Sequence, residues 1–392
     1  MTASTLDIRA LRTRMEPVFA CSFSDGLTRA YSHVDRLCLH LCFRLAHDCG
    51  LPSAHAEPLA DLIARVGVAP DAFYLLGAAL DILADEGFAR HTKHGWESPC
   101  PCPPDDSAEL QRQARAACSE ATPIFELIER CHEHAVGFLT GREPGLAAIF
   151  QRSDISLWER VHTVDRVMSI YADFLVPVLE AIAGRRMRLL ELGAGVGAVL
   201  QRCLSLLDRV DVEQYCFTDL GQSFLQSAQG IYAGQKRIRF ARVDLNLPLR
   251  SQGLLPESFD AVIAVNVLHV AKNLCFSLRE IYDVLKMRGY LILAEGSPPD
   301  CFRRWRLDVI FAFLRGWWDV SVDPVLRRRP GFLLPSEWQK ALLACGFDSV
   351  YLLPGEDWFR GPCRGGVVIA GKQTPMAAGE SYESTREVSW AI

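Results

Sequence analysis

The sequence lacks several features that mark membrane, secreted and nucleic-acid-binding proteins. It has no uninterrupted apolar run of about 18 residues, the length that a membrane-spanning helix needs. Its first ten residues have no apolar core of the secretory-signal type, so we expect a cytoplasmic protein that does not bind membranes. Positive charge is not in excess, because 42 Lys and Arg face 47 Asp and Glu, for a net charge of −5. A nucleic acid is therefore not expected as a partner.

The cysteines also lack the spacing of metal or disulfide sites. There are 14, with no C-x-x-C pair, and Cys100-Pro-Cys102 is too short a spacing for ordinary zinc ligation. Most lie among apolar neighbours, which is typical of small buried side chains in a reducing compartment. We expect no metal.

The composition is that of a folded protein, with 49% hydrophobic and 23% charged residues, and 392 residues suggest two domains and a smaller piece. The first half is predicted to be helical. Apolar segments at helical spacing are followed by a possible two-stranded wing about a His94-Gly95 turn. They cover residues 35–49, 57–66 and 71–86, and the wing covers 87–96. This order is typical of a winged-helix module, which the Pro-rich stretch 98–107 would end.

The charge of this first part argues against DNA binding. Residues 1–110 contain nine basic and fifteen acidic side chains, and the segment 71–86 has no Lys or Arg. A recognition helix without cations lacks the phosphate and base contacts that hold it in a groove. We therefore expect residues 1–107 to be a packing or dimerisation domain, and the protein to be a homodimer.

The second half alternates strand-like and helical segments, which predicts a doubly wound α/β fold with a parallel sheet. A helical connector over 108–184 precedes a sheet domain over 185–372, and a polar, mobile tail over 373–392 follows. Two late strands are expected to form an edge hairpin. The expected strands are Met187–Leu192, Gln214–Thr218, Ile238–Val243, Ala261–Asn266, Tyr290–Ala294, Ser349–Leu353 and Gly366–Ala370.

A glycine loop follows the first strand, in Glu191-Leu-Gly-Ala-Gly-Val-Gly197. Alternating glycines let a ligand lie against bare backbone at a helix N-terminus. The loop also satisfies the loose dinucleotide fingerprint. A carboxylate at Glu191 would repel a pyrophosphate, but it suits a ligand with an ammonium and a sulfonium, as in S-adenosylmethionine. The alternative is a glycine turn that binds nothing.

Two more acids end neighbouring strands. Asp219 follows the second strand, where it can accept both hydroxyls of a ribose, and Asp244 follows the third, where it can accept from an adenine amino group. Open α/β sheets bind ligands at this carboxyl edge. One such acid alone is more simply a helix cap, but three in register with a glycine loop favour a nucleoside-type ligand.

These motifs resemble those of class I S-adenosylmethionine-dependent methyltransferases. The blocks Phe217–Leu225, Phe259–His269 and Gly316-Trp-Trp318 more narrowly resemble the methylation domains embedded in polyketide synthases, over about residues 136–371. The first 110 residues are not part of that resemblance. They look like the winged-helix module of freestanding small-molecule methyltransferases.

The resemblance implies a Rossmann-like methyltransferase sheet, S-adenosylmethionine as methyl donor and S-adenosylhomocysteine as product. It also implies a set of cofactor-binding residues. These are Glu191, Gly193, Ala194, Gly195, Gly197, Asp219, Leu220, Asp244, Leu245 and Asn266.

His269 and Glu295 are the candidate catalytic residues. His269 follows the fourth strand and Glu295 ends the fifth, so both lie at the same edge of the sheet. An imidazole can remove a proton, and a carboxylate behind it holds the tautomer and stabilises the imidazolium. The resemblance implies that such a dyad deprotonates the α-carbon of a β-ketoacyl thioester. The alternative is that His269 caps a helix and Glu295 merely ends a strand.

An insertion over 297–347 is predicted to form a lid. Its Trp305, Trp317 and Trp318 would exclude water and confine the acceptor. Arg327-Arg-Arg329 could bind a carboxylate or the phosphate of a phosphopantetheine arm, or could form a solvated face.

The sequence thus predicts a methyltransferase of secondary metabolism. Methylation of an activated carbon in a β-ketoacyl substrate, free or carrier-bound, is the first hypothesis. Two alternatives are O-, N- or S-methylation of a free metabolite, and a winged-helix regulator with a sensor domain.

Overall fold

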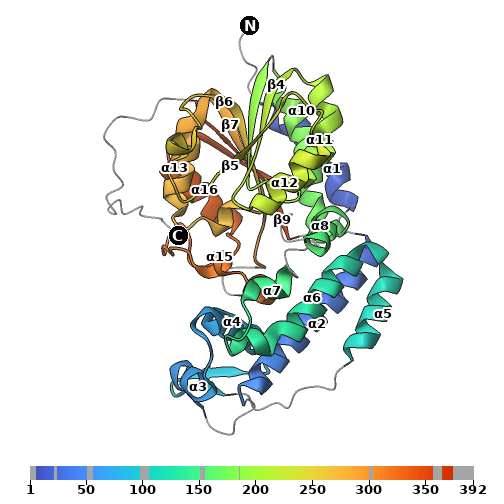
Figure 1. Cartoon of the computed structure of the whole chain (residues 1–392), viewed down its shortest axis with the longest axis vertical. Helices are drawn as coiled ribbons and strands as arrows, with labels where there is room; N and C mark the ends of the chain where they lie inside the picture. The colour runs from blue at the N-terminus through green and yellow to red at the C-terminus, as the bar shows by residue number, and fades with distance from the viewer. Residues whose placement is uncertain are drawn as a thin grey trace.

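A central sheet flanked by helices lies above a mainly helical region in the computed structural model (Figure 1). The structure describes residues 6–21, 24–50, 56–97, 106–150, 155–184, 186–299, 303–355 and 364–373.

The sheet has seven strands in the order β5-β4-β3-β6-β7-β9-β8. The first five are parallel, and β9 pairs antiparallel with both β7 and β8. The strands are β3 (Met187–Leu192), β4 (Val212–Asp219), β5 (Ile238–Arg242), β6 (Phe259–Val265), β7 (Leu285–Gly296), β8 (Ser349–Leu353) and β9 (Gly365–Gly371). The predicted doubly wound sheet with an edge hairpin is confirmed. Only β7 begins much earlier than expected, because Leu285 pairs with Phe259.

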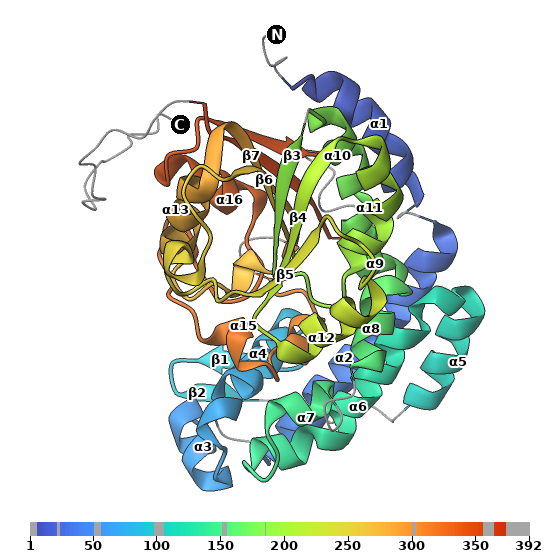
Figure 2. The same ribbon diagram turned by 45° about the horizontal axis from the view of Figure 1, so that its top comes forward.

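Helices cover both faces of the sheet (Figure 2). One face packs against α13 (Leu274–Val284) and α16 (Pro335–Ala344). The other packs against α9 (Arg166–Asp173), α10 (Leu175–Ile182), α11 (Ala198–Arg209) and α12 (Gln222–Ile231). Apolar side chains on both faces explain why the strands read as nearly continuous apolar runs.

The first helix, α1 (Ile8–Cys21), belongs to the sheet domain. Its Leu11, Met15 and Phe19 join the core that α10 and α11 form on the sheet, and the Phe19 ring lies 4.4 Å from that of Phe174. The packing therefore divides the chain differently from the unit 1–107 expected from the sequence. The physical reason is that α1 buries its apolar face on α10 rather than on the helices that follow it.

The helical region is built around α2 (Asp25–Asp48). It packs against α4 (Phe73–Asp85), α5 (Ser107–Ala117) and α6 (Thr122–Leu139). The predicted helices and wing are present, as α3 (Leu59–Val66), α4 and the hairpin of β1 (Arg90–Thr92) and β2 (Gly95–Glu97). The apolar surface from which a dimer was expected is used inside this bundle, and the homodimer stays a prediction.

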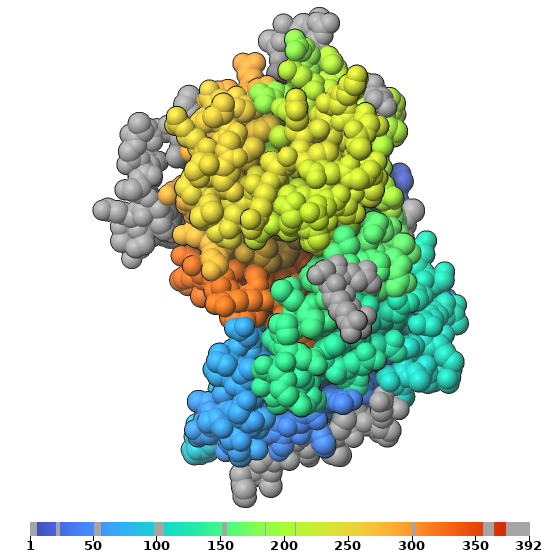
Figure 3. Space-filling model, in the orientation of Figure 1, coloured from blue at the N-terminus to red at the C-terminus, as the bar shows by residue number. Residues whose placement is uncertain are grey.

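The predicted lid joins the two parts of the molecule. Trp305, Phe311, Trp317 and Phe332 lie in the same apolar core as α2, α4 and α6. The lid contains α14 (Asp308–Phe311) and α15 (Arg315–Trp318), and α7 (Gly145–Ile149) and α8 (Ser156–Thr163) lie beside it in the same core. In the space-filling view, the orange lid lies between the yellow sheet domain and the blue and teal helical region (Figure 3). The lid is thus part of a fixed core.

Within the described residues, no helix combines the length and apolar character needed to cross a bilayer. The described cysteines are free and mostly buried, as expected, whereas Cys100, Cys102 and residues 374–392 of the tail lie outside the described part. In the described part, no three His, Cys, Asp or Glu side chains gather as metal ligands would.

Met15→Ala tests whether α1 contributes to the sheet core. Met15 is completely buried, so its truncation should lower the free energy of unfolding by about 2–5 kcal/mol. Urea unfolding followed by circular dichroism measures this. The neighbouring exposed substitution Glu16→Ala should stay within about 0.5 kcal/mol of the wild type. Equal stability of both variants would show that α1 contributes nothing to the core.

Candidate active site

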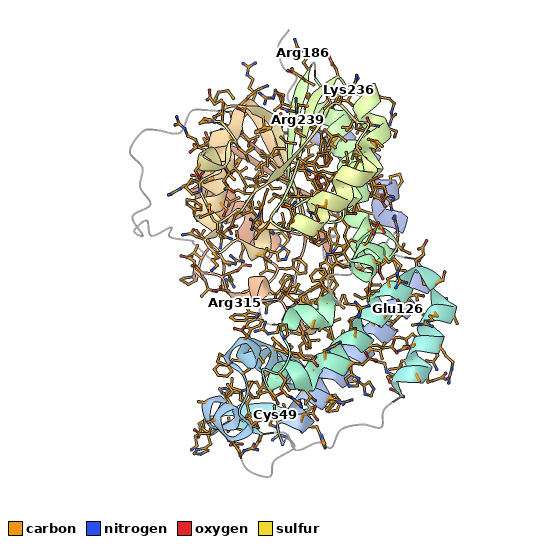
Figure 4. The ribbon with its side chains drawn as sticks, viewed as in Figure 1. Cys49, Glu126, Arg186, Lys236, Arg239 and Arg315 are labelled. Carbon is orange, nitrogen blue, oxygen red and sulfur yellow. The ribbon has the colours of Figure 1, made fainter. Side chains whose placement is uncertain are left out.

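The carboxyl ends of the parallel strands meet the junction with the helical region. Arg186, Lys236 and Arg239, which lie just before or early in β3 and β5, are at the far end of the molecule in Figure 4, whereas Arg315 lies at the junction. A cavity of about 330 Å³ opens at this carboxyl edge. Its walls come from the ends of β3, β4 and β6, from α8 and α9, and from the lid.

The glycine loop forms the floor of this cavity. Gly193, Gly195 and Gly197 all have positive φ (61°, 52° and 78°). A Cβ at Gly193 would lie 2.2 Å from Cγ2 of Val267, so no larger residue fits there. A Cβ at Gly195 would meet nothing closer than 4.0 Å. The backbone there is bare and faces open space, as ligand binding by the loop requires.

Glu191 lies under the loop and lines the cavity. It is almost completely buried, and the Tyr215 hydroxyl donates a hydrogen bond of 2.6 Å to its Oε2. Burial raises the pKa of Glu191 to about 8; the bond from Tyr215 lowers it and the nearby Asp219 carboxyl raises it. A cation in the cavity would favour the ionised form of this carboxyl.

Asp219 ties the glycine loop to the end of β4. Its Oδ2 accepts from the Gly195 amide (2.8 Å) and its Oδ1 from the Gly221 amide (2.7 Å). Burial raises the pKa of Asp219, and these backbone bonds oppose that shift. Each oxygen keeps a lone pair for a ligand hydroxyl.

The structure brings most of the predicted cofactor residues together, but not all. Glu191, Gly193, Ala194, Gly195, Asp219 and Asn266 line the cavity, whereas Gly197, Leu220, Asp244 and Leu245 do not. Asp244 folds back on its own loop, where its Oδ1 accepts from the amide and the side chain of Asn246. Asn266 has a positive φ of 49°, and its Oδ1 accepts from the Gly296 amide at 3.0 Å.

His269 and Glu295 form a buried pair at the other end of the cavity. Nδ1 of His269 lies 2.7 Å from Oε2 of Glu295. Oε1 of Glu295 accepts from the amides of Val267 (3.1 Å) and Leu268 (2.9 Å), so the carboxylate is held in place. His269 lines the cavity, and the bond at Nδ1 leaves Nε2 for a reacting group. His269 lies in the short helix η4 (Leu268–Val270).

Aromatic side chains of the lid surround the imidazole. The rings of Trp317 and Phe332 lie 4.9 and 4.5 Å from that of His269, and both line the cavity. Trp305 packs behind Phe332, at 5.7 Å, while Trp318 stacks on Tyr74 of α4. Of the three predicted lid tryptophans, only Trp317 lines this cavity.

The arginine run does not act as one unit. Arg327 is buried, and its guanidinium donates to the backbone carbonyls of His269 and Ala271. The solvated face that the sequence allowed is therefore wrong for Arg327. Arg328 is half-exposed beside Glu337, and Arg329 donates to the carbonyl of Arg303.

The sequence analysis missed the wall that α8 and α9 contribute. Trp158, His162 and Met168 line the cavity opposite the glycine loop. Burial lowers the pKa of His162 to about 4, and the bond between its Nδ1 and the Trp158 carbonyl (3.0 Å) opposes that shift. The only signal in the sequence was the spacing of Trp158 and His162, four residues apart on one helix.

Comparison with known proteins places this geometry in a family. Residues 190–291 match a family model described as a methyltransferase domain. The chain carries a class I S-adenosylmethionine-dependent methyltransferase domain. It is 30% identical to the polyketide synthase ThaQ of Burkholderia thailandensis over 301 residues, and to the pyochelin synthetase PchF of Pseudomonas aeruginosa over 285. These matches cover 72% and 69% of this chain, but only 14% and 16% of the relatives.

Solved structures share the fold over nearly the whole chain. The CurJ carbon methyltransferase superposes with a TM-score of 0.84 at 23% identity, over 94% of this chain and all of that one. The CMeT domain of the citrinin polyketide synthase gives 0.78 at 21%, over 94% and 96%. The expectation that the first 110 residues fall outside such domains is therefore wrong. The alignment leaves only 6% of the methyltransferase chain unmatched, so most of these residues belong to the shared fold.

The pKa of Glu191 predicts a pH-dependent affinity for the methyl donor. In the free protein this carboxyl is mostly protonated below pH 8, and a bound cation favours its ionised form, so binding should release a proton. Affinity should rise between pH 6 and 8, by at most about tenfold per unit, and then level off. Of the groups that face Glu191, Tyr215 and Cys203 titrate well above this window.

Calorimetry with S-adenosylmethionine in buffers of different ionisation enthalpy measures both the affinity and the proton release. Glu191→Gln is the control, because the ligand's own amino group titrates near pH 8 in both proteins. The difference between the two curves isolates Glu191. Identical pH profiles would contradict the assignment.

Proposed function

We propose that this protein methylates the α-carbon of a β-ketoacyl thioester, with His269 as general base and Glu295 as its partner. The observation that carries the proposal is the pair itself. A buried imidazole, held at Nδ1 by a fixed carboxylate, lies in the same cavity as the glycine loop. An acceptor carbon must lose a proton before it can take a methyl group, and this pair supplies a base beside the donor site.

The residues of the glycine loop fit S-adenosylmethionine. Gly193 and Gly195 leave bare backbone, Glu191 offers a carboxylate for the ammonium and sulfonium, and Asp219 offers oxygens for the ribose. Asn266 contributes at the edge between β6 and β7. When bound, the donor supplies an electrophilic methyl group and its own leaving group, so the protein's main task is alignment.

The His269–Glu295 pair handles the proton. Nε2 of His269 takes it from the α-carbon of the acceptor, and the enolate that remains carries the electron pair to the methyl carbon. The charge of Glu295 stabilises the imidazolium and fixes the tautomer with hydrogen on Nδ1. The proton then leaves to solvent when the product departs.

The acceptor end of the cavity suits an acyl chain. Beyond His269 its walls are apolar, formed by Val270, Phe311, Leu314, Trp317 and Phe332. Such a site excludes water, which strengthens the interaction between base and carboxylate and protects the enolate. It offers few polar groups to a hydrophilic metabolite.

A carrier-bound thioester is the acceptor that the relatives favour. The matching relatives are polyketide synthases and related synthetases, and the shared fold includes the helical region. The reason for favouring a free acceptor, an N-terminal module foreign to embedded domains, has been removed. O-, N- or S-methylation of a free metabolite remains the alternative for the tests below.

The regulator hypothesis finds no support in the packing. The helix that would enter a DNA groove, α4, lies against the lid: Asp81 pairs with Arg304 at 2.9 Å, and Tyr74 stacks on Trp318. Its surface is thus partly covered by the protein itself.

His269→Ala should lower turnover by about 10²–10⁴-fold, the usual contribution of a general base, with S-adenosylmethionine affinity nearly unchanged. Methyl transfer to acetoacetyl-pantetheine, followed by mass spectrometry, measures this, and calorimetry measures the affinity. Glu295→Gln should cost less, because it keeps the shape but loses the charge.

The matched control is His134→Ala. His134 also pairs with a glutamate, Glu143, at 2.5 Å, but it does not line the cavity. It should leave turnover unchanged. Wild-type turnover in His269→Ala would overturn the base assignment and favour a thioether acceptor, which has no proton to lose.

Asp219→Ala should weaken the binding of S-adenosylhomocysteine by about 1.5–3 kcal/mol, the value of hydrogen bonds to a charged group. Asp244→Ala should cost less, since Asp244 does not line the cavity. Titration calorimetry compares them. A larger loss for Asp244→Ala would show that the adenine lies beyond the cavity described here.

A further inference from the structure

We propose that Arg327 is a positioning residue for methyl transfer, whose guanidinium fixes the loop that carries His269. The inference rests on the proposed role of His269 as base. Arg327 touches neither donor nor acceptor and acts through the backbone on either side of the histidine.

Arg327 stands in a short, well-braced turn of the lid. The amide of Asp323 donates to the Arg327 carbonyl (2.7 Å), and the Arg327 amide donates to the Asp323 carbonyl (3.0 Å). The Asp323 carboxylate accepts from the amides of Val325 and Leu326, at 2.8 and 2.9 Å. The turn is thus closed on itself, and the arginine side chain leaves it at a defined point.

The guanidinium and Glu295 hold the histidine loop from opposite sides. Glu295 accepts from the amides of Val267 and Leu268, which precede the histidine. Arg327 donates through Nη2 to the carbonyl of His269 itself and through Nη1, at 2.6 Å, to that of Ala271. Amides on one side and carbonyls on the other are therefore fixed by two charged side chains, which leaves the imidazole little freedom to swing.

This arrangement costs the fold something, because Arg327 is only 1% exposed and its Nε has no partner among the described residues. Burial lowers the pKa of Arg327 to about 10, and the nearby Glu295 and Glu337 carboxyls oppose that shift. A buried cation with an unused donor is poor value for stability alone, since a well-packed apolar residue would do as well or better. What a single ammonium cannot do is reach two carbonyls with a planar pair of donors.

The charge of Arg327 also acts on the base. Three charged groups surround His269: Glu295 from β7, Arg327 from the lid turn and Asp308 from α14, whose carboxyl interacts with the imidazole through space. Arg327 is the one cation among them. It opposes protonation of the resting imidazole and so keeps the base in its active form, while the two carboxyls stabilise the imidazolium once it forms.

The test compares Arg327→Met, Arg327→Lys and the neighbouring control Arg328→Met. Arg328 is half-exposed and lies 3.8 Å from Glu337, so its loss removes a surface charge without touching the loop. With acetoacetyl-pantetheine, Arg327→Met should lower kcat by about tenfold to a hundredfold, less than removal of the base itself. The Kd for S-adenosylhomocysteine should change less than twofold, and Arg328→Met should behave as the wild type.

Two readouts separate positioning from simple loss of structure. The acid limb of the kcat–pH profile should move to higher pH in Arg327→Met, because the imidazole without the neighbouring cation is easier to protonate; in Arg327→Lys it should stay in place while kcat still falls. Hydrogen exchange of a peptide spanning residues 264–273 should accelerate in Arg327→Met and not in Arg328→Met. Methylguanidinium should restore part of the activity of Arg327→Ala, at concentrations far below those that denature proteins.

Wild-type kcat and an unmoved pH profile in Arg327→Met would overturn the inference. If Arg327→Met does not fold, Arg327→Lys and the rescue of Arg327→Ala decide: normal kcat in the lysine variant, or no rescue, would count against it. Failure of the proposed function is distinguishable, because His269→Ala would then retain activity. If His269→Ala is inactive while all Arg327 variants are normal, only this inference falls.

Discussion

The arrangement of the site depends on one carboxylate. Glu295 ends β7 in the middle of the sheet, completely buried, and both of its oxygens are engaged: one by two amides after β6, the other by Nδ1 of His269. A buried carboxylate is tolerated only when its lone pairs are satisfied in this way. Since β6 and β7 are paired in the sheet, the histidine inherits the precision of the strands, and the cavity is built around that fixed point.

The lid extends this order across the junction. Trp317 and Phe332 contact His269 and also belong to the core of the helical region, so the packing of α2, α4 and α6 reaches the imidazole through the lid. The helical region is therefore a wall of the acceptor site rather than an independent module. This explains why the fold shared with the carbon methyltransferase structures includes it.

Much of the site could be predicted from sequence because it lies at strand ends. Parallel strands place their carboxyl ends at one edge, so Glu191, Asp219, His269 and Glu295 could be grouped from chain order alone. Asp244 shows the limit of the rule: it is at a strand end, but its own loop captures the side chain. His162 and Arg327 could not be placed, because each reaches the site from a helix or turn whose position depends on packing between distant segments.

The sequence by itself determined the doubly wound sheet, its edge hairpin, the glycine loop and the register of the acids, since these depend on local periodicity and on the fixed geometry of parallel strands. The tertiary structure alone decided that α1 covers the sheet, that the lid and the helical bundle share one core, and that one arginine of three turns inward to the histidine loop. The physical reason is the same in each case. Which apolar face meets which partner, and which charge is worth burying, depends on the total contact area and hydrogen bonding of segments far apart in the chain, and no local pattern records them.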